Sequence, residues 1–461
     1  MSERLLTRGD DRYRLLVALA LLFVLVLFGG ASRADEPQQA LVRAASIAAI
    51  AATLWPLDFQ PIRQQRGLAI AVAAAVALLV AQLIPLPPDV WSGMPGHDLY
   101  NLIAVETGQQ GWRPASLTPD LTLNTLGAML PPIAVGLSLL YLDFEDRTRW
   151  WTGLIGLACL SGLLGMLQLS SGGASLHLFR TSSLDSAVGL FANRNHQTAF
   201  MACGLPLIAA LTAIRIRSGT KPHQAMSFGL SIAGLLLVSL IVTGSRMGLA
   251  LGGLGAVSGI AIYRSETGDL RTGRRSRPRL IGAVVGLVAL TALAVLAMRG
   301  EAIDRLASGA VLDRSRLDAL APMMETVRAY WPFGAGFGSF DAVYRRFEPD
   351  SLLSTIYLNH AHNEPLELAI EGGVAALLLL AAFLLWWLDT ARRTVSIPSK
   401  RRRALAWAAV VTGLLLMLSS LVDYPLRTTL LGGLFAAACV ELARSTRAQR
   451  GRDRPAATCT S

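Results

Sequence analysis

The sequence predicts an all-α fold, a polytopic membrane helix bundle of about 12 transmembrane helices with one long extracytoplasmic loop. Three observations predict it. Of the 461 residues 53% are hydrophobic and only 16% are charged, whereas soluble domains carry about 25% charged residues. Apolar runs of about 20 residues, the length that a helix needs to cross a bilayer, recur along the chain. Basic residues gather in short clusters between these runs, which is typical of membrane proteins.

The apolar runs give the spans in chain order, each boundary being good to about three residues. The first run follows a basic segment and precedes Ser32-Arg33-Ala34, so that residues 1–34 also resemble a cleavable signal peptide. We expect a retained helix, because the first span of a multi-pass protein often looks like this. The second and last spans are short and are expected to be tilted or partly buried. The predicted spans are 14–30, 41–57, 67–86, 122–142, 151–170, 197–214, 226–243, 246–263, 280–298, 366–388, 404–422 and 428–443.

The distribution of Lys and Arg predicts the orientation, since these residues favour the cytoplasmic side. With both termini cytoplasmic, every short loop agrees with its assigned side. Two extracytoplasmic loops then stand out, 87–121 and 299–365. The second is long enough to be functional, and its many aromatic residues argue against disorder. The net charge of +11 is thus explained by topology, and we expect no nucleic-acid partner.

Polar residues at the ends of the apolar runs are the main functional signal, because a charge within a membrane span is costly, rare and usually functional. Four clusters occur, in the stretches GLFANRNHQTAF, VTGSRMGLALGG, NHAHNEPLELAIEGG and SSLVDYPLRTT. The predicted topology puts all four on the extracytoplasmic side. Their candidate site residues are Asn193, Arg194, Asn195, Arg246, His360, His362, Asn363, Asp423 and Arg427.

These residue types suit the displacement of a lipid diphosphate by a sugar hydroxyl. Arginine is always charged and binds phosphate oxygens in pairs, which suggests Arg194 and Arg246. A histidine such as His362 can take a proton from a hydroxyl near neutral pH. No metal ion or other cofactor is required if arginines neutralise the leaving group.

Simpler interpretations apply to each residue alone. Arg246 can be an interfacial anchor, and Arg194 can pair with lipid headgroups. His360 and His362 do not make a metal site by themselves, since no third ligand lies near them in the sequence. The glycine run GAGFGSF at 334–340 lacks the lysine of a phosphate loop and is expected to form turns. No two cysteines have disulfide or metal spacing.

Taken together and in order, the motifs ANRNHQTAF, SRMGLAL, PFGAGFGSFDAVYRR, HAHNEPLELAIEGG and DYPLR resemble the O-antigen ligase and polymerase superfamily of bacterial surface-glycan assembly. The resemblance covers roughly residues 185–435. It implies a catalytic region at 185–435, preceded by N-terminal helices at 1–184 and followed by the end of the last helix and a cytoplasmic tail at 436–461.

The resemblance implies an inverting glycosyltransferase in the bacterial inner membrane that works on the periplasmic face. The donor would be a glycan linked to undecaprenyl diphosphate. The acceptor would be a glycan or lipid A–core, and a chain-length regulator is a further possible partner besides membrane lipids. Arg194 and Arg246 would bind the diphosphate and His362 would activate the acceptor. Arg316 in the long loop would match a further family arginine.

Ligase, polymerase and protein O-oligosaccharyltransferase remain open. The ligase pattern continues from His362-Asn363 to Gly373 but departs from this sequence at Ala376, which favours a polymerase slightly. A transporter or flippase is the alternative from another class. Transporters often contain inverted repeats and broken helices at mid-bilayer, but no internal repeat is evident here and the polar clusters lie at one surface.

Overall fold

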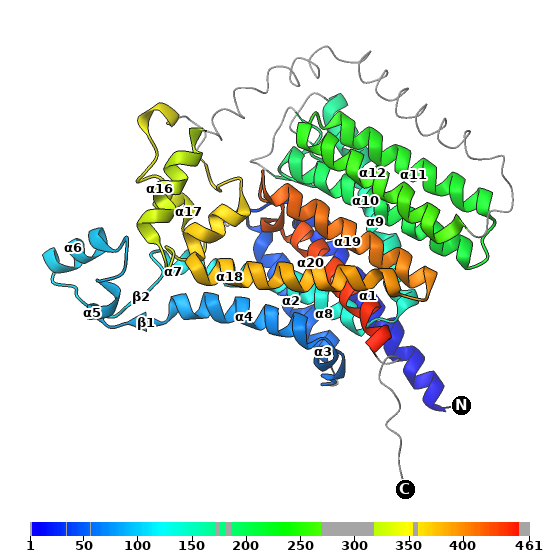
Figure 1. Ribbon diagram of the computed structural model, residues 1–461, viewed down its shortest axis with the longest axis horizontal. Helices are drawn as coiled ribbons and strands as arrows, with labels where there is room; N and C mark the ends of the chain where they lie inside the picture. The colour runs from blue at the N-terminus through cyan, green and yellow to red at the C-terminus, as the bar shows by residue number, and fades with distance from the viewer. Residues whose placement is uncertain are drawn as a thin grey trace, which may run out of the picture.

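The computed structural model describes residues 2–33, 35–55, 57–171, 176–179, 186–268, 318–353 and 358–450. Over these residues the chain is almost entirely helical (Figure 1). The first half contains α1 (Ser2–Phe28), α2 (Gln38–Leu54), α3 (Gln60–Gln64), α4 (Arg66–Leu83), β1 (Pro85–Leu86), α5 (Pro88–Trp91), α6 (Asp98–Glu106), β2 (Arg113–Pro114), α7 (Pro119–Ala128), α8 (Leu130–Tyr141), α9 (Phe144–Ser171) and α10 (Arg194–Arg217). The second half contains α11 (Pro222–Val242), α12 (Arg246–Thr267), α16 (Leu320–Tyr330), α17 (Phe340–Tyr344), η3 (Asp350–Leu352), α18 (Glu364–Arg393), η4 (Thr394–Ser396), α19 (Lys400–Ser420), η5 (Pro425–Arg427) and α20 (Thr429–Arg450).

The all-α membrane fold predicted from the apolar runs is confirmed. Among the described residues, 8 helices are long and apolar enough to cross a membrane. Each predicted span coincides with a helix or a pair of helices except 280–298, which lies outside the described residues. The count of twelve spans therefore stays a prediction. The span 122–142 is formed by two helices, α7 and α8, because Pro131 and Pro132 have no N–H with which to continue the helical ladder.

The centre of the bundle is α10, which packs against α9, α11, α12 and α19. Its most apolar window is 89% buried, whereas that of α4 is only 11% buried. In Figure 1 α11 and α12 lie along the upper edge, α4 lies along the lower edge, and α18, α19 and α20 run between them. The bundle thus has a closely packed side at α10–α12 and a loosely packed side at α4.

Glycines allow α12 to lie directly on α10. A Cβ atom at Gly255 would stand 2.7 Å from the carbonyl oxygen of Ala202, and one at Gly259 would stand 3.1 Å from that of Leu205. Pro206 of α10 cannot donate to the Ala202 oxygen four residues earlier, so the close approach occurs where α10 has an unused acceptor. This packing brings the N-termini of α10 and α12 together.

The helix α18 is broken at Gly373, which has a φ of 57°. The break frees two carbonyl groups, and the loop after α16 satisfies them: Ala335 N donates to Ile370 O and Gly336 N donates to Glu371 O, both at 2.9 Å. Gly334, Gly336 and Gly338 all have positive φ, so the glycine run forms turns, as expected. The long loop is thereby fixed to the beginning of α18.

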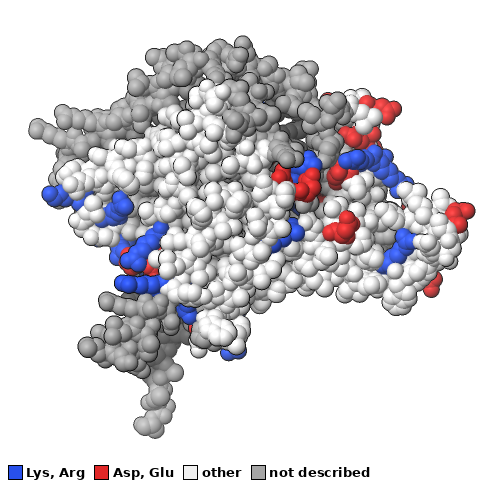
Figure 2. All heavy atoms as spheres, turned by 180° about the vertical axis from the view of Figure 1, so that it is seen from behind, with Lys and Arg blue, Asp and Glu red and all other residues white. Residues whose placement is uncertain are grey.

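Charged side chains gather toward the two ends of the bundle, and Figure 2 shows a broad uncharged band between them. At the end that holds the N-terminus of α19, ion pairs join different helices: Arg403 contacts Glu266 of α12 at 2.9 Å, and Arg147 of α9 contacts Glu441 of α20 at 2.8 Å. The four polar clusters found in the sequence lie at the opposite end, because α10, α12 and α18 begin there and α19 ends there.

Candidate active site

A buried aspartate organises the candidate site. Asp423 lies in the turn between α19 and η5, and its side chain is 0% exposed. The Nδ1 of His362 donates to Asp423 Oδ1 at 3.0 Å, and the Nδ2 of Asn195 donates to Oδ2 at 2.7 Å. The backbone N–H of Tyr424 also donates to Oδ1 at 3.0 Å. Both carboxylate oxygens are therefore engaged, and the carboxylate fixes the ring of His362.

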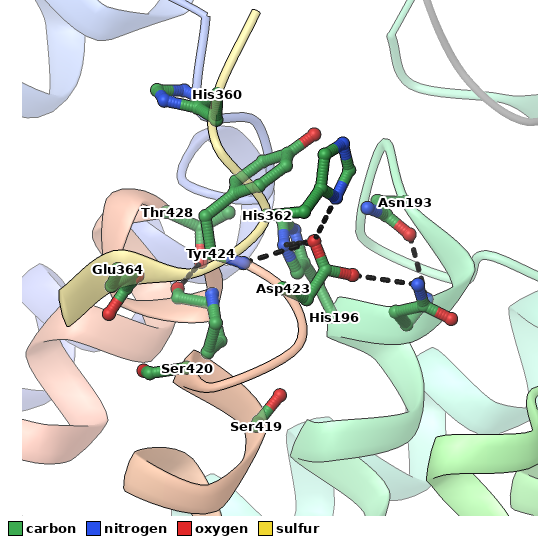
Figure 3. Close-up of polar contacts among 12 residues, drawn as sticks. Asn193, His196, His360, His362, Glu364, Ser419, Ser420, Asp423, Tyr424 and Thr428 are labelled. Carbon is green, nitrogen blue, oxygen red and sulfur yellow. Dashed lines mark hydrogen bonds and ion pairs between the residues drawn. The ribbon is translucent and has the colours of Figure 1, made fainter. Parts of the chain in front are cut away.

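His362 is positioned for proton transfer. Its side chain is 14% exposed, and Figure 3 shows its second ring nitrogen pointing away from Asp423. Because Nδ1 carries the proton shared with Asp423, the neutral ring has its lone pair on Nε2. His362 has a φ of 49°, a conformation that few non-glycine residues adopt. The next residue, Asn363, caps α18 by accepting a hydrogen bond from Leu366 N at 3.0 Å, so it has a structural role.

A short chain of hydrogen bonds connects this pair to the starts of α10 and α12. Asn193 caps α10 by accepting from Asn195 N at 2.8 Å. The Oδ1 of Asn195 accepts from the hydroxyl of Ser245 at 3.0 Å, and the same hydroxyl accepts from Gly248 N at 3.1 Å as the cap of α12. Ser245 is not among the site residues predicted from the sequence, although a serine directly before a helical run is a known capping signal.

Arg194 and Arg246 are the first residues of these two helices. Arg246 is exposed and Arg194 is partly buried. A helix N-terminus presents unpaired N–H groups and the positive end of the helix dipole, and it therefore attracts anions. Two adjacent N-termini that each begin with arginine make this corner of the bundle electrostatically suited to a diphosphate.

Tyr424 packs against three histidines. Its ring centroid lies 4.4 Å from that of His360, 4.8 Å from that of His362 and 5.0 Å from that of His196. In Figure 3 the Tyr424 ring stands between His360 and His362. His196 is 1% exposed, and its Nε2 lies 4.0 Å from Asp423 Oδ1. His196 and Tyr424 lie in the stretches GLFANRNHQTAF and SSLVDYPLRTT, but their residue types alone predict no role for them.

His360 and Arg427 belong to a second polar cluster beside the first. His360 Nδ1 lies 2.8 Å from Oε1 of Glu367, whose Oε2 accepts from Ala361 N at 2.9 Å. Arg427 contacts Glu367 at 3.1 Å and Glu371 at 3.0 Å, and both carboxylates are 0% exposed. Burial alone would lower the pKa of Arg427, but the surrounding glutamates outweigh it and raise that pKa. Arg427 therefore holds the segment before α18 in place.

Arg316 and the span 280–298 lie outside the described residues. Within the described part of the chain, no group of three or more His, Cys, Asp and Glu side chains is arranged as a metal site.

One comparison with known protein families gives a match. The sequence model of the O-antigen ligase family matches residues 231–381. The matched segment contains Arg246, His360 and His362, whereas Asn195 and Asp423 lie outside it. No curated protein matches the chain.

Proposed function

Since the chain belongs to the O-antigen ligase and polymerase superfamily, we propose that it transfers a glycan from a polyprenyl diphosphate to an acceptor hydroxyl at the periplasmic face of the bacterial inner membrane. The observation that carries the proposal is the convergence of His362 and Asp423 with the N-termini of α10 and α12.

His362 acts as the general base in the proposed reaction. Its Nε2 accepts the proton of the acceptor hydroxyl while the oxygen forms a bond to the anomeric carbon of the donor sugar. The bond from that carbon to the diphosphate oxygen breaks with its electron pair. Asp423 keeps the proton on Nδ1 and stabilises the imidazolium that forms. A single displacement of this kind inverts the anomeric centre.

Arg194 and Arg246 stabilise the negative charge that develops on the departing diphosphate. Charge-assisted hydrogen bonds from guanidinium groups and N–H groups at a helix start are among the strong interactions available for this. The arginines and the helix dipoles provide positive charge from the chain itself, so no step of the proposed mechanism calls for a metal ion.

The orientation with both termini in the cytoplasm is part of the proposal. It is supported by the basic residues at the end of the bundle opposite the site, among them Arg215, Arg217 and the run Lys400–Arg403. Among the members of the superfamily, we favour a polymerase of exopolysaccharide or O-antigen units, because Ala376 departs from the ligase pattern.

The proposal is tested by purifying the chain with His362→Ala or Arg246→Ala and measuring glycan transfer from lipid-linked donor isolated from the host. We expect His362→Ala to lower the turnover rate about 10²–10⁴-fold, the usual contribution of a general base. We expect Arg246→Ala to raise the KM of the donor or lower kcat, with a total loss of about 10–100-fold, because one charge-assisted contact is lost.

Arg392→Ala is the matched control. Arg392 is an exposed arginine that pairs with Asp389 at the opposite end of the bundle, and its removal should leave transfer unchanged. Wild-type rates in correctly folded His362→Ala and Arg246→Ala proteins would disprove the mechanism. The cellular counterpart separates transfer from transport: loss of a transferase leaves lipid-linked units unjoined on the periplasmic side, whereas loss of a flippase leaves them on the cytoplasmic side.

A further inference from the structure

Two histidine–carboxylate pairs lie side by side at the end of the bundle that carries the candidate site. The Nδ1 of His362 contacts Asp423 Oδ1 at 3.0 Å, and the Nδ1 of His360 contacts Glu367 Oε1 at 2.8 Å. Both carboxylates are 0% exposed, whereas the rings of His362 and His360 are 14% and 16% exposed. The proposed mechanism uses only the first pair, although a substrate can reach the histidine of either pair.

The two rings present the same kind of atom to a substrate. An ionised carboxylate only accepts hydrogen bonds, so the Nδ1 that faces it carries the proton in each ring. The lone pair of each neutral ring is then on Nε2. The site therefore offers two nitrogens that accept hydrogen bonds, although the deprotonation of one hydroxyl requires only one of them.

Tyr424 holds the two rings apart. Its ring centroid lies 4.4 Å from that of His360 and 4.8 Å from that of His362, and in Figure 3 it stands between them. Tyr424 is itself 8% exposed, so its ring mainly packs against the histidines. A pyranose is about as wide as a phenol ring and carries its hydroxyls around its edge. Two hydroxyls of one sugar can therefore meet two nitrogens that are held on the two sides of Tyr424.

Glu367 fixes the backbone that carries both histidines. Its Oε2 accepts from Ala361 N at 2.9 Å, and its backbone N–H donates to Asn363 O at 3.0 Å. The chain is thus tied to the first turns of α18 both before and after His362. Because these contacts fix the distance between the two nitrogens, the pair would select two hydroxyls that are separated by a matching distance.

Arg427 suits the second pair to binding rather than to proton removal. The Oε1 of Glu367 that faces His360 also contacts Arg427 at 3.1 Å. A permanent cation therefore already contributes to balancing the charge of this carboxylate, which has less capacity left to stabilise an imidazolium. A neutral His360 that accepts a hydrogen bond agrees best with these contacts.

We propose that His360 determines the linkage of the product. Its Nε2 accepts a hydrogen bond from one hydroxyl of the acceptor sugar, and this contact brings another hydroxyl of the same sugar to Nε2 of His362. The inference rests on the proposed function, since it assigns a specificity residue for the same reaction. A sugar with at least two free hydroxyls uses both nitrogens, whereas the single hydroxyl of a serine or threonine acceptor would leave His360 unused.

The test replaces His360 by residues that separate packing from hydrogen bonding. His360→Phe keeps an aromatic ring against Tyr424 but has no accepting nitrogen, whereas His360→Gln keeps an amide oxygen that can accept. His223→Phe is the matched control, because His223 is exposed at the start of α11, at the opposite end of the bundle. Each purified chain is incubated with the lipid-linked glycan isolated from the host. Methylation analysis then identifies the linkage of the product.

We expect a single linkage from the wild type and from His223→Phe. His360→Phe should yield a second linkage isomer, because the acceptor sugar can turn once the contact is lost. With labelled donor held constant, the KM of the acceptor should rise about two- to tenfold, the effect of one lost hydrogen bond, and the KM of the donor should not change. His360→Gln should keep the wild-type linkage.

Three results would overturn the inference. The first is a single linkage with an unchanged KM of the acceptor in His360→Phe. The second is the same mixture of linkages from His360→Phe and His360→Gln, which would assign the effect to packing. The third is a complete loss of transfer in a His360→Phe protein with the wild-type unfolding temperature, which would show that His360 takes part in the chemical step.

Failure of the inference is distinguishable from failure of the proposed function. Transfer by the wild type that is lost in His362→Ala supports the transferase, whatever linkage His360→Phe produces. Attachment of the glycan to a serine or threonine by the wild type would keep the transferase but overturn the role of His360. No transfer by the wild type would refute both.

Discussion

Asp423 receives hydrogen bonds from two distant parts of the chain as well as from its own turn. His362 precedes α18, Asn195 belongs to the first turn of α10, and Tyr424 N is the next backbone group. A fully buried carboxylate is costly unless its oxygens are satisfied, so these contacts stabilise its charge. The same contacts determine which nitrogen of His362 carries a proton. Asp423 therefore stabilises the turn and also fixes the proton of His362, the proposed base, on Nδ1.

Asp423→Asn should separate these two roles. The asparagine amide can donate a hydrogen bond to Nδ1 of His362, which favours the tautomer with the proton on Nε2, and that tautomer cannot accept a proton from the acceptor. We expect kcat to fall about 10²–10⁴-fold with little change in the KM of the donor. Asp389→Asn, at the opposite end of the bundle, is the control. A variant that kept the wild-type rate and pH profile would show that the pair does not act as a base.

Arg427 and Arg246 are expected to respond differently to removal. Arg427 lies between two carboxylates that are 0% exposed, so Arg427→Ala would leave buried negative charges without a partner. Such a loss costs about 3–5 kcal/mol. We therefore expect a lower unfolding temperature in detergent for Arg427→Ala than for Arg246→Ala, because Arg246 is exposed. Equal unfolding temperatures for the two variants would argue that Arg427 does not hold the fold together.

At the scale of elements, the starts of α10 and α12 are positioned by packing far from the site. The glycines of α12 remove the side chains that would separate it from α10, and the missing N–H of Pro206 leaves the Ala202 oxygen at the contact. Ser245 and Asn195 then join the two N-termini by a hydrogen bond. The proposed diphosphate site is accordingly a consequence of backbone contact between two membrane helices.

Gly255→Leu tests this dependence. The new side chain would meet the Ala202 oxygen, and overpacking of this kind costs about 1–3 kcal/mol. We expect α12 to move away from α10 and the KM of the donor to rise. Gly253→Leu is the matched control, since nothing lies within 4 Å of a Cβ atom at Gly253. If both variants bound the donor like the wild type, the spacing of α10 and α12 would not matter for the diphosphate.

The sequence predicts features that depend on neighbouring residues better than contacts between residues that are far apart in the chain. Apolar runs predict helices because crossing a bilayer is a local requirement of length and hydrophobicity. The sequence also put His362 and Asp423 on one side, but their contact over 61 positions depends on how α18 packs beside α19. Arg427 was grouped with the site on its charge alone. Its contacts with Glu367 and Glu371 form only when the turn before α20 folds against α18, so the sequence does not predict them.

At the scale of the whole molecule, charged side chains gather at both ends of an apolar band (Figure 2), and the candidate site lies at the end opposite the N-terminus of α19. The ion pairs Arg403–Glu266 and Arg147–Glu441 join helices at the end that we assign to the cytoplasm. The loosely packed α4 lies on one side and the closely packed α10–α12 unit lies on the other.

The proposed orientation, with both termini in the cytoplasm, predicts which loops a reagent can reach from the periplasm. Gly108 lies with open space around it in the loop 87–121, which we assign to the periplasm, and Val395 of η4, directly after α18, is 63% exposed. In a chain whose four cysteines are replaced by alanine, Gly108→Cys should react with a membrane-impermeant maleimide in cells whose outer membrane has been made permeable. Val395→Cys should react only after the inner membrane is lysed. Labelling of Val395→Cys in intact inner membranes would show that the topology is the reverse of the proposed one and that the site lies at the cytoplasmic face. A cytoplasmic site would be incompatible with a donor presented in the periplasm, so this labelling pattern tests the positive-inside assignment and the proposed reaction together.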